Sequence, residues 1–167
     1  MISDIERLIA IEEIRQLKAR YFYTLDGKDW DGYQAVYAPD ATLDCQHAMY
    51  ARDPVTGEAI SSGKVVPESE AVVTSRLTHG AAAIRADVEA AVRDMVTVHH
   101  GHTAEIEITS PTTARAVWAM EDVLRGPPGW TPQTVHGYGH YRETYERIDG
   151  RWHIKTCKLT RLKIDAT

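Results

Sequence analysis

The chain has little cysteine. Only Cys45 and Cys157 occur in 167 residues, far apart and outside any C-x-x-C spacing. Two such cysteines do not suggest a disulfide framework or a zinc knuckle, so a hydrophobic core must stabilise the fold. A chain of this length can bury such a core as one domain, residues 1–167. We expect both thiols to be buried and reduced, and the protein to be cytoplasmic.

Long apolar runs and clustered basic residues are also missing. No run of 18 apolar residues occurs, and the opening MISDIERLIA lacks a basic segment followed by an apolar one. Neither a transmembrane helix nor a signal peptide is therefore predicted. Lys and Arg number 19 against 24 Asp and Glu, giving a net charge of −5 with neutral histidines. This balance argues against a nucleic-acid or membrane partner.

Several sequence signatures of cofactor and nucleophile sites are absent. The chain has no G-x-G-x-x-G, Walker loop, G-x-S-x-G elbow or H-E-x-x-H motif. Nothing therefore indicates a nucleotide, a flavin or a serine nucleophile, and we expect no cofactor.

The first half of the chain predicts helices. Ser3 and Glu6 form a capping-box pattern, and apolar residues then recur at helical spacing as far as Leu25. This predicts a helix over residues 4–25, with Gly27 as its stop. Asp29 is a candidate cap for a short helix over 30–36, which Pro39 would end. An alanine-rich segment predicts a third helix over 81–95.

The last seventy or so residues predict strands. Long β-branched or aromatic segments cover 98–108, 112–124, 135–148 and 151–164, separated by turn signals such as Asp149-Gly150. A shorter strand is expected over 41–46, and residues 47–64 are expected to form an irregular loop or a weak hairpin. Helices followed by an antiparallel meander indicate the α+β class, in which a curved sheet can wrap around the first helix and leave a pocket.

The segment RYFYTLDGKDW supplies the first candidate site residues. Asp26 ends an apolar helical face, where the helix dipole disfavours a carboxylate. It is either an exposed helix-end residue or a pocket carboxylate that orients an imidazole. Tyr21 occupies an apolar position, which suits a core residue as well as a proton donor.

Three histidines, His99, His100 and His102, open the strand predicted over 98–108. Histidine is the usual general base near neutral pH. His100 and His102 share one face of a strand and His99 lies on the other. The first two could bind a metal, but no third ligand is evident, so we expect none. The face of His99 becomes acidic further along the strand, so His99 can enter an apolar pocket only if the strand switches faces. Gly101 is a natural site for the bulge that would do this.

The later strands supply candidate substrate-binding residues. Asp122 shares a face with Trp118, and a carboxylate on such a face needs a partner if it is buried. Arg161, between apolar neighbours, could pair with Asp122 or anchor a substrate carboxylate. A solvated Asp122 and a surface Arg161 are the alternatives. Tyr141 adds an amphipathic side chain.

Four segments carry a resemblance to a known family. They are IEEIRQLKARYFYTLDGKDWD, HHGHTAEIEITSPTTA, WAMED and YERIDGRWHI. Over about residues 8–164, the chain resembles the SnoaL-like branch of the nuclear transport factor 2 superfamily. Within that branch, which includes scytalone dehydratases and hexachlorocyclohexane dehydrochlorinases, it is most similar to the bile acid 7α-dehydratases. The resemblance implies a cone of curved mixed β-sheet around N-terminal helices, and a homo-oligomer in which a trimer is favoured over a dimer.

The resemblance also implies an activity. Its catalytic groups fall on Tyr21, Asp26 and His99, and the residues expected to bind substrate are Asp122, Arg161, Trp118, His102 and Tyr141. We expect a cofactor-independent dehydratase that acts on an apolar steroid-like, bile-acid-like or polycyclic alcohol, free or as its CoA ester. His99 is the base, Asp26 orients it and Tyr21 is the acid. A ketosteroid-type isomerase, a polyketide cyclase and a non-catalytic binding module are the alternatives. Cys45 and the segments 47–64 and 127–130 depart from the family pattern, which leaves the substrate identity open.

Overall fold

The computed structural model spans the chain and describes residues 2–46, 48, 51–52, 56, 58–61, 64–65 and 77–167. Its helices are α1 (Asp4–Asp26), α2 (Trp30–Ala35) and α3 (Ala81–Val92). Its strands are β1 (Tyr37–Asp44), β2 (Ala51–Arg52), β3 (Ala59–Ser61), β4 (Lys64–Val65), β5 (Leu77–His79), β6 (Val96–Ser110), β7 (Thr113–Arg125), β8 (Thr134–Ile148) and β9 (Arg151–Ala166).

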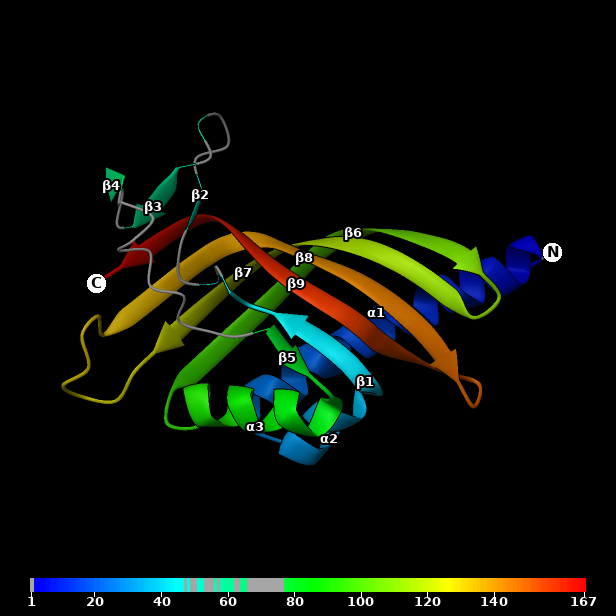
Figure 1. Ribbon diagram of the computed structural model, residues 1–167, viewed down its shortest axis with the longest axis horizontal. Helices are drawn as coiled ribbons and strands as arrows, with labels where there is room; N and C mark the ends of the chain where they lie inside the picture. Colours follow the sequence, from blue (N-terminus) through cyan, green and yellow to red (C-terminus); the bar gives the residue numbers. More distant parts are fainter. Residues whose placement is uncertain are drawn as a thin grey trace.

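The strands form one mixed sheet in the order β4-β3-β2-β9-β8-β7-β6. Strands β6 to β9 are an antiparallel meander, whereas β1 pairs in parallel with β9 and antiparallel with β5. The sheet curves over α1, and α2 and α3 lie below it beside β5 (Figure 1). The predicted α+β class and the curved mixed sheet around N-terminal helices are both confirmed.

Helix α1 supplies one wall of the core. Its capping box at Ser3 and Glu6 forms as predicted. Its buried residues recur at the helical period. They are Ala10, Ile14, Leu17, Lys18, Tyr21, Thr24 and Leu25. Gly27 caps the helix in a right-handed conformation, and the left-handed residue is Lys28, with φ of 59°. The helix thus stops where predicted, and Lys28 turns the chain away.

The start of β1 and the end of α3 differ most from the predicted boundaries, and one strand was not predicted. Strand β1 begins at Tyr37 rather than at residue 41, because Pro39 lies where the register against β9 is interrupted and no ladder donor is needed. Helix α3 ends at Val92 rather than at residue 95. Strand β5, three residues long, was not predicted because it is too short to show a period. In the segment 47–64, β2 and β3 form a short antiparallel pair, consistent with a weak hairpin, while its other residues lie largely outside the described part.

Strand β6 changes faces at Gly101, as predicted. His99 pairs with Asp122, the register shifts between Gly101 and Ala104, and Ala104 then pairs with Trp118. Residues with odd numbers face α1 before the shift, and residues with even numbers face it afterwards. A Cβ at position 101 would lie 2.5 Å from the Phe22 ring, so α1 and β6 approach each other too closely for a side chain there.

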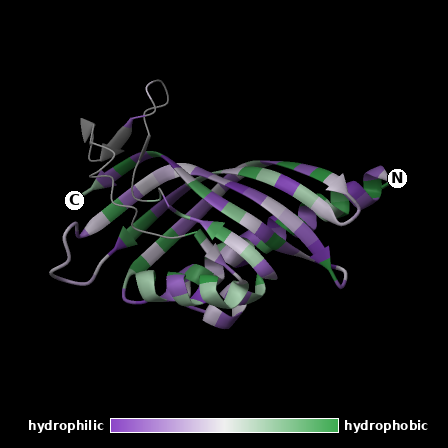
Figure 2. Ribbon diagram, in the orientation of Figure 1, coloured by the Kyte–Doolittle hydropathy of each residue, from purple (hydrophilic) through white to green (hydrophobic). Residues whose placement is uncertain are grey.

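The core lies between α1 and the concave face of the sheet. Strands β6 to β9 are banded with alternating hydrophilic and hydrophobic residues (Figure 2), as expected when one face is buried and the other is solvated. No helix in the described part of the chain is long and apolar enough to cross a membrane.

Candidate active site

The end of α1 meets β6 in a carboxylate–imidazole pair. His99 Nδ1 lies 2.6 Å from Asp26 Oδ1, and the His99 amide donates to Asp26 Oδ2 over 2.8 Å. Because a carboxylate only accepts, Nδ1 donates its proton to Asp26. The His99 side chain is only 8% exposed. The structure therefore presents an oriented imidazole whose second nitrogen, Nε2, makes no bond to Asp26.

Two residues that sequence reasoning missed hold Asp26 in place. The Thr97 hydroxyl donates to Asp26 Oδ1 over 2.8 Å, and Lys28 Nζ donates to that hydroxyl over 2.8 Å. Partial burial raises the pKa of Asp26, but the hydrogen bonds from His99 and Thr97 and the charge of His99 outweigh it, so this pKa lies below its usual value. Thr97 could have been found, because it lies two residues before His99 on the same face of the strand.

Beyond His99 lies a second buried carboxylate. His99 Nε2 is 3.9 Å from Asp122 Oδ2, and the Asp122 side chain is 2% exposed. Arg161 donates to both oxygens of Asp122, over 2.9 and 2.7 Å, and through Nε to the carbonyl of Ala48. Of the two roles considered for Arg161, the structure shows the pairing with Asp122. A proton on Nε2 would therefore face a carboxylate that Arg161 has already fixed.

His99, Asp122 and Arg161 open onto a cavity of about 550 Å³. Its remaining walls come from α1, α2, α3, the sheet and the residues just after β1, and they are mainly apolar. The lining residues are Tyr21, Leu25, Tyr33, Leu43, Cys45, Ala48, Val88, Ala90, Ala91, Val92, Leu124, Tyr141 and Leu159, with Thr78 and Asp87 as polar exceptions. Burial raises the pKa of the Cys45 thiol to about 12, which leaves it protonated. Apolar walls with a few converging polar groups are typical of a small-molecule site.

Tyr21 and Tyr141 face this cavity as a pair of phenols. Their ring centres lie 5.8 Å apart at an interplanar angle of 70°. Burial raises the pKa of both hydroxyls well above the ordinary value; the neighbouring phenols Tyr141, Tyr33 and Tyr37 add to the effect on Tyr21, and Asp122 adds to that on Tyr141. Both therefore stay protonated and can donate hydrogen bonds.

A buried ion pair, also missed from the sequence, lies behind these phenols. Lys18 Nζ is 2.6 Å from Glu143 Oε1, and both side chains are 0% exposed. The second Glu143 oxygen accepts from the Tyr145 hydroxyl, which in turn accepts from Trp118 Nε1 over 2.8 Å. The sequence did hold a signal, because Lys18 occupies the apolar face of α1 and Glu143 alternates with buried tyrosines on β8.

Two predicted substrate-binding residues are not brought to the cavity. His102 is exposed, because the register shift after Gly101 places it in the bulge and outside the lining. Trp118 is buried in the core, where its indole donates to Tyr145 rather than facing the cavity. Their predicted positions in the pocket are therefore corrected. Tyr21, Asp26, His99, Asp122, Arg161 and Tyr141 are brought together.

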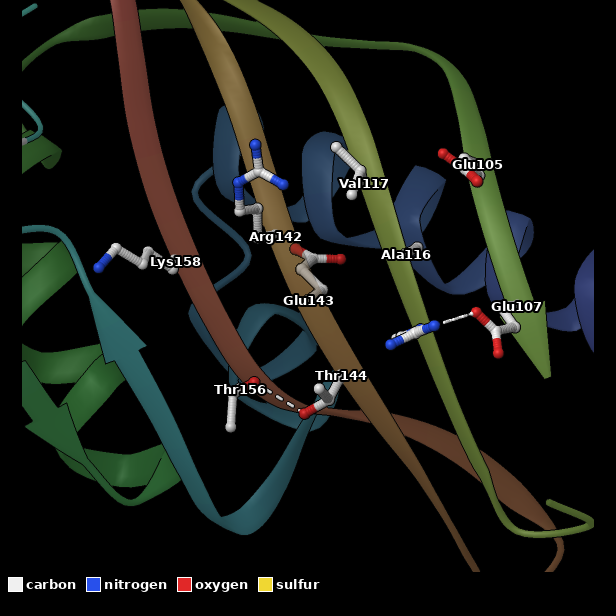
Figure 3. A pocket seen from close by; sticks show the side chains of 10 residues that line it. Glu105, Glu107, Ala116, Val117, Arg142, Glu143, Thr144, Thr156 and Lys158 are labelled. Carbon is white, nitrogen blue, oxygen red and sulfur yellow. Dashed lines mark hydrogen bonds and ion pairs between the residues drawn. The ribbon is translucent and has the colours of Figure 1, made fainter. Parts of the chain in front are cut away.

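The opposite face of the sheet carries a second concavity of about 520 Å³. This outer groove is lined by Glu105, Glu107, Arg115, Ala116, Val117, Arg142, Glu143, Thr144, Thr156 and Lys158. Figure 3 shows it with α1 behind the strands. Arg115 pairs with Glu107, and the hydroxyls of Thr144 and Thr156 lie 2.7 Å apart. Four of its polar residues thus pair with one another, and no histidine is among its described lining residues.

No three His, Cys, Asp or Glu residues in the described part of the chain are arranged to hold a metal ion. His100, one of the histidines considered for such a site, points away from the cavity and lies 3.5 Å from Glu121 on the outer face. In the cavity, His99 lies beside carboxylates and phenols, which are groups that can take part in acid–base chemistry.

Comparison with known proteins gives relatives that span most of the chain. The SnoaL-like domain family matches residues 6–158. A Gibberella zeae protein described as a probable cyclase is 24% identical over 151 residues, which cover 89% of each chain. The structure is similar to that of a scytalone dehydratase-like protein from Novosphingobium aromaticivorans, with a TM-score of 0.74, 18% identity, and coverage of 99% of this chain and 92% of that one. It is also similar to a hexachlorocyclohexane dehydrochlorinase from Novosphingobium barchaimii, with a TM-score of 0.72, 15% identity, and coverage of 99% and 94%.

Proposed function

Because the chain belongs to the SnoaL-like domain family, we propose that it is a cofactor-independent dehydratase that eliminates water from an apolar polycyclic alcohol. The observation that carries this proposal is the Asp26–His99 pair, whose Nδ1 to Oδ1 distance is 2.6 Å, at the wall of an apolar cavity. Such a pair supplies a base without a metal or a cofactor.

In the proposed reaction, His99 Nε2 takes a proton from the carbon next to a carbonyl or vinylogous carbonyl. The Nδ1 proton stays on the hydrogen bond to Asp26, which stabilises the imidazolium. Tyr21 donates a hydrogen bond to the developing enolate oxygen or to the departing hydroxyl. The C–O bond breaks as the electron pair of the broken C–H bond forms the conjugated alkene. The departing hydroxide takes up the proton from His99 Nε2 and leaves as water, which restores the base.

The charges of the cavity favour an uncharged substrate. Among the lining residues that the structure describes, Arg161 is the cation, and Asp122 and the Ala48 carbonyl occupy it. A substrate carboxylate inside the cavity would find no unpaired cation among these residues. We therefore expect the part of the substrate that enters the cavity to be uncharged. A steroid-like or other polycyclic alcohol fits this description, with any carboxylate or CoA ester directed to the solvent. The similarity to bile acid 7α-dehydratases stays a prediction and guides the choice of ligands.

A ligand screen followed by product analysis tests the proposal. Hydroxysteroids, bile acids and their CoA esters are screened by thermal shift, and each hit is incubated with the protein and analysed by mass spectrometry. We expect a product lighter than the substrate by one water, and no such product with His99→Ala. A product of unchanged mass would instead identify an isomerase. If ligands bind but none in the panel is converted, the result would favour a non-catalytic binding module.

Cyclisation is the second candidate, because the Gibberella zeae relative is described as a probable cyclase and matches 89% of the chain. The same base could remove the proton that starts a ring closure in a polyketide. Incubation with a linear polyketide distinguishes the two, since ring closure by aldol addition leaves the mass unchanged and creates a new ring.

We also propose that the protein is a cytoplasmic homo-oligomer, with a trimer favoured over a dimer, and that it uses neither a nucleic-acid nor a membrane partner. The family pattern and the acidic composition support this proposal. Light scattering coupled to size-exclusion chromatography measures the oligomeric state, and a monomeric mass at micromolar concentration would contradict it.

A further inference from the structure

The buried Lys18–Glu143 pair has no solvent contact and lies outside the proposed proton transfers. Both side chains are 0% exposed, and 2.6 Å separates Nζ from Oε1. Burying two charges costs free energy that their attraction only about repays, and well-packed apolar residues are often at least as stabilising. Stability alone therefore gives little reason for this pair in the core.

Its position relative to the cavity suggests a role. Lys18 Nζ lies 3.8 Å from the ring centre of Tyr21 and 3.8 Å from that of Tyr141. Both phenols line the cavity that His99 and Asp122 also line. The ammonium thus contacts the faces of two aromatic rings that line the cavity.

A cation on a ring face attracts the π electrons of that ring. In a phenol this favours negative charge moving from the oxygen toward the ring, so the hydroxyl becomes a stronger hydrogen-bond donor. The partner carboxylate acts elsewhere: the Tyr145 hydroxyl donates to Glu143, and burial together with Glu143 raises the pKa of Tyr145. Glu143 holds Lys18, and the effect of Lys18 falls on Tyr21 and Tyr141.

We propose that Lys18, held by Glu143, is a positioning residue that acts through Tyr21 and Tyr141: it orients the two rings and strengthens their hydroxyls as donors to a negatively charged oxygen in the cavity. This role rests on the proposed function, because elimination next to a carbonyl builds up negative charge on the carbonyl oxygen, and the two hydroxyls would stabilise that charge. The donor strength is itself a binding property and can be measured without turnover.

The test compares a charged ligand with a neutral one of similar shape. In alkaline buffer, 4-nitrophenol is an anion with its charge on oxygen, whereas 4-nitroanisole is uncharged. The ratio of their dissociation constants is measured for the native protein and for Lys18→Met/Glu143→Gln, which removes both charges together and nearly keeps the volumes. We expect the preference for the anion to fall about tenfold in the double variant, because a desolvated cation–π contact is of that order.

A matched control uses another ion pair between the same two elements. Arg147 on β8 lies 3.4 Å from Glu13 on α1, and both side chains are partly exposed, outside the cavity lining. Arg147→Met/Glu13→Gln should leave the preference unchanged. If Lys18→Met/Glu143→Gln folds with a native circular dichroism spectrum and keeps the native preference, the pair is only a core element and the inference is overturned.

A second comparison keeps the inference testable if the double variant does not fold. Tyr21→Phe and Tyr141→Phe keep the rings beside Lys18 and remove only the hydroxyls. We expect each to lower the preference for 4-nitrophenolate by about tenfold while 4-nitroanisole binding is unchanged. An unaltered preference in both variants would show that these hydroxyls are not the donors and would refute the inference. If no dehydrated product forms, the proposed function is overturned. The ratios of dissociation constants still test the inference, because they are measured without turnover.

Discussion

The two concavities of this protein lie on opposite faces of one sheet and differ in what surrounds their charges. On the inner face, α1, α3 and apolar side chains enclose the cavity, and the Asp122 and Arg161 side chains are 2% and 3% exposed. On the outer face, the groove is of similar volume, about 520 Å³, but the side chains of Arg115 and Glu107 are 66% and 52% exposed. Charges are screened by water in the groove and not in the cavity.

The difference follows from the alternation of strand residues combined with cover from the helices. On β7, Asp122 faces α1 and the next residue toward the N-terminus, Glu121, faces the solvent beside His136 and His100. Adjacent residues on one strand thus enter different dielectric environments. Residues of similar chemistry should therefore have large effects on the inner face and small ones on the outer face, which the following substitutions test.

The largest effect is expected for His99→Ala. Removing the proposed general base should lower the rate of dehydration about 10⁴-fold, whereas ligand binding persists because the apolar walls remain. Steady-state rates and ligand affinity measured on the same preparation check this. His100→Ala, one residue away on the outer face, is the matched control and should keep the native rate. Equal losses in both variants would contradict the comparison.

Arg161→Met should have the next largest effect, on stability. It leaves the Asp122 carboxylate buried without the two hydrogen bonds of 2.9 and 2.7 Å. Removing one partner of a buried pair costs about 3–5 kcal/mol of the free energy of unfolding. Urea denaturation of the variant and of Arg161→Met/Asp122→Asn provides the measurement, and the double variant should recover part of the loss. A decrease below about 1 kcal/mol in the single variant would show that water reaches Asp122.

Asp26→Asn should change the pH dependence of stability. The pKa of Asp26 is lowered in the folded protein, since the hydrogen bonds from His99 and Thr97 outweigh partial burial. A carboxyl whose pKa is lower when folded stabilises the fold above its unfolded pKa, about 4, and this stabilisation is lost as pH falls through the folded value. Urea midpoints measured across the acidic range should therefore converge for the native protein and Asp26→Asn as pH decreases. A constant difference at every pH would assign the effect to packing.

The sequence predicted the helices and the meander because these depend on local patterns, whereas the meeting of Asp26 with His99, 73 residues apart, was implied by the family resemblance. The helical period of α1 ends at Asp26, and the parity of β6 required a switch near Gly101, which the register shift confirms. The placement of His102 could not be predicted, since a bulge displaces the residues within it by an amount that only the partner strand sets. The Lys18–Glu143 pair depends on a contact across 125 residues, and a charged residue on an apolar face does not reveal its partner.

The smallest effect is expected for Arg115→Met on the outer face. Arg115 Nε donates to Glu107 over 2.7 Å, a distance equal to that between Arg161 and Asp122 Oδ2. Judged by distance alone, both pairs would contribute equally to the free energy of unfolding. Because both outer side chains are exposed, however, water and salt replace the lost contact, and we expect a change of about 0–1 kcal/mol in the free energy of unfolding. Denaturation at low and high salt measures it, with Arg161→Met alongside. A loss comparable to that of Arg161→Met would mean that the groove is covered in solution, as a second copy of the chain packed on this face would cover it.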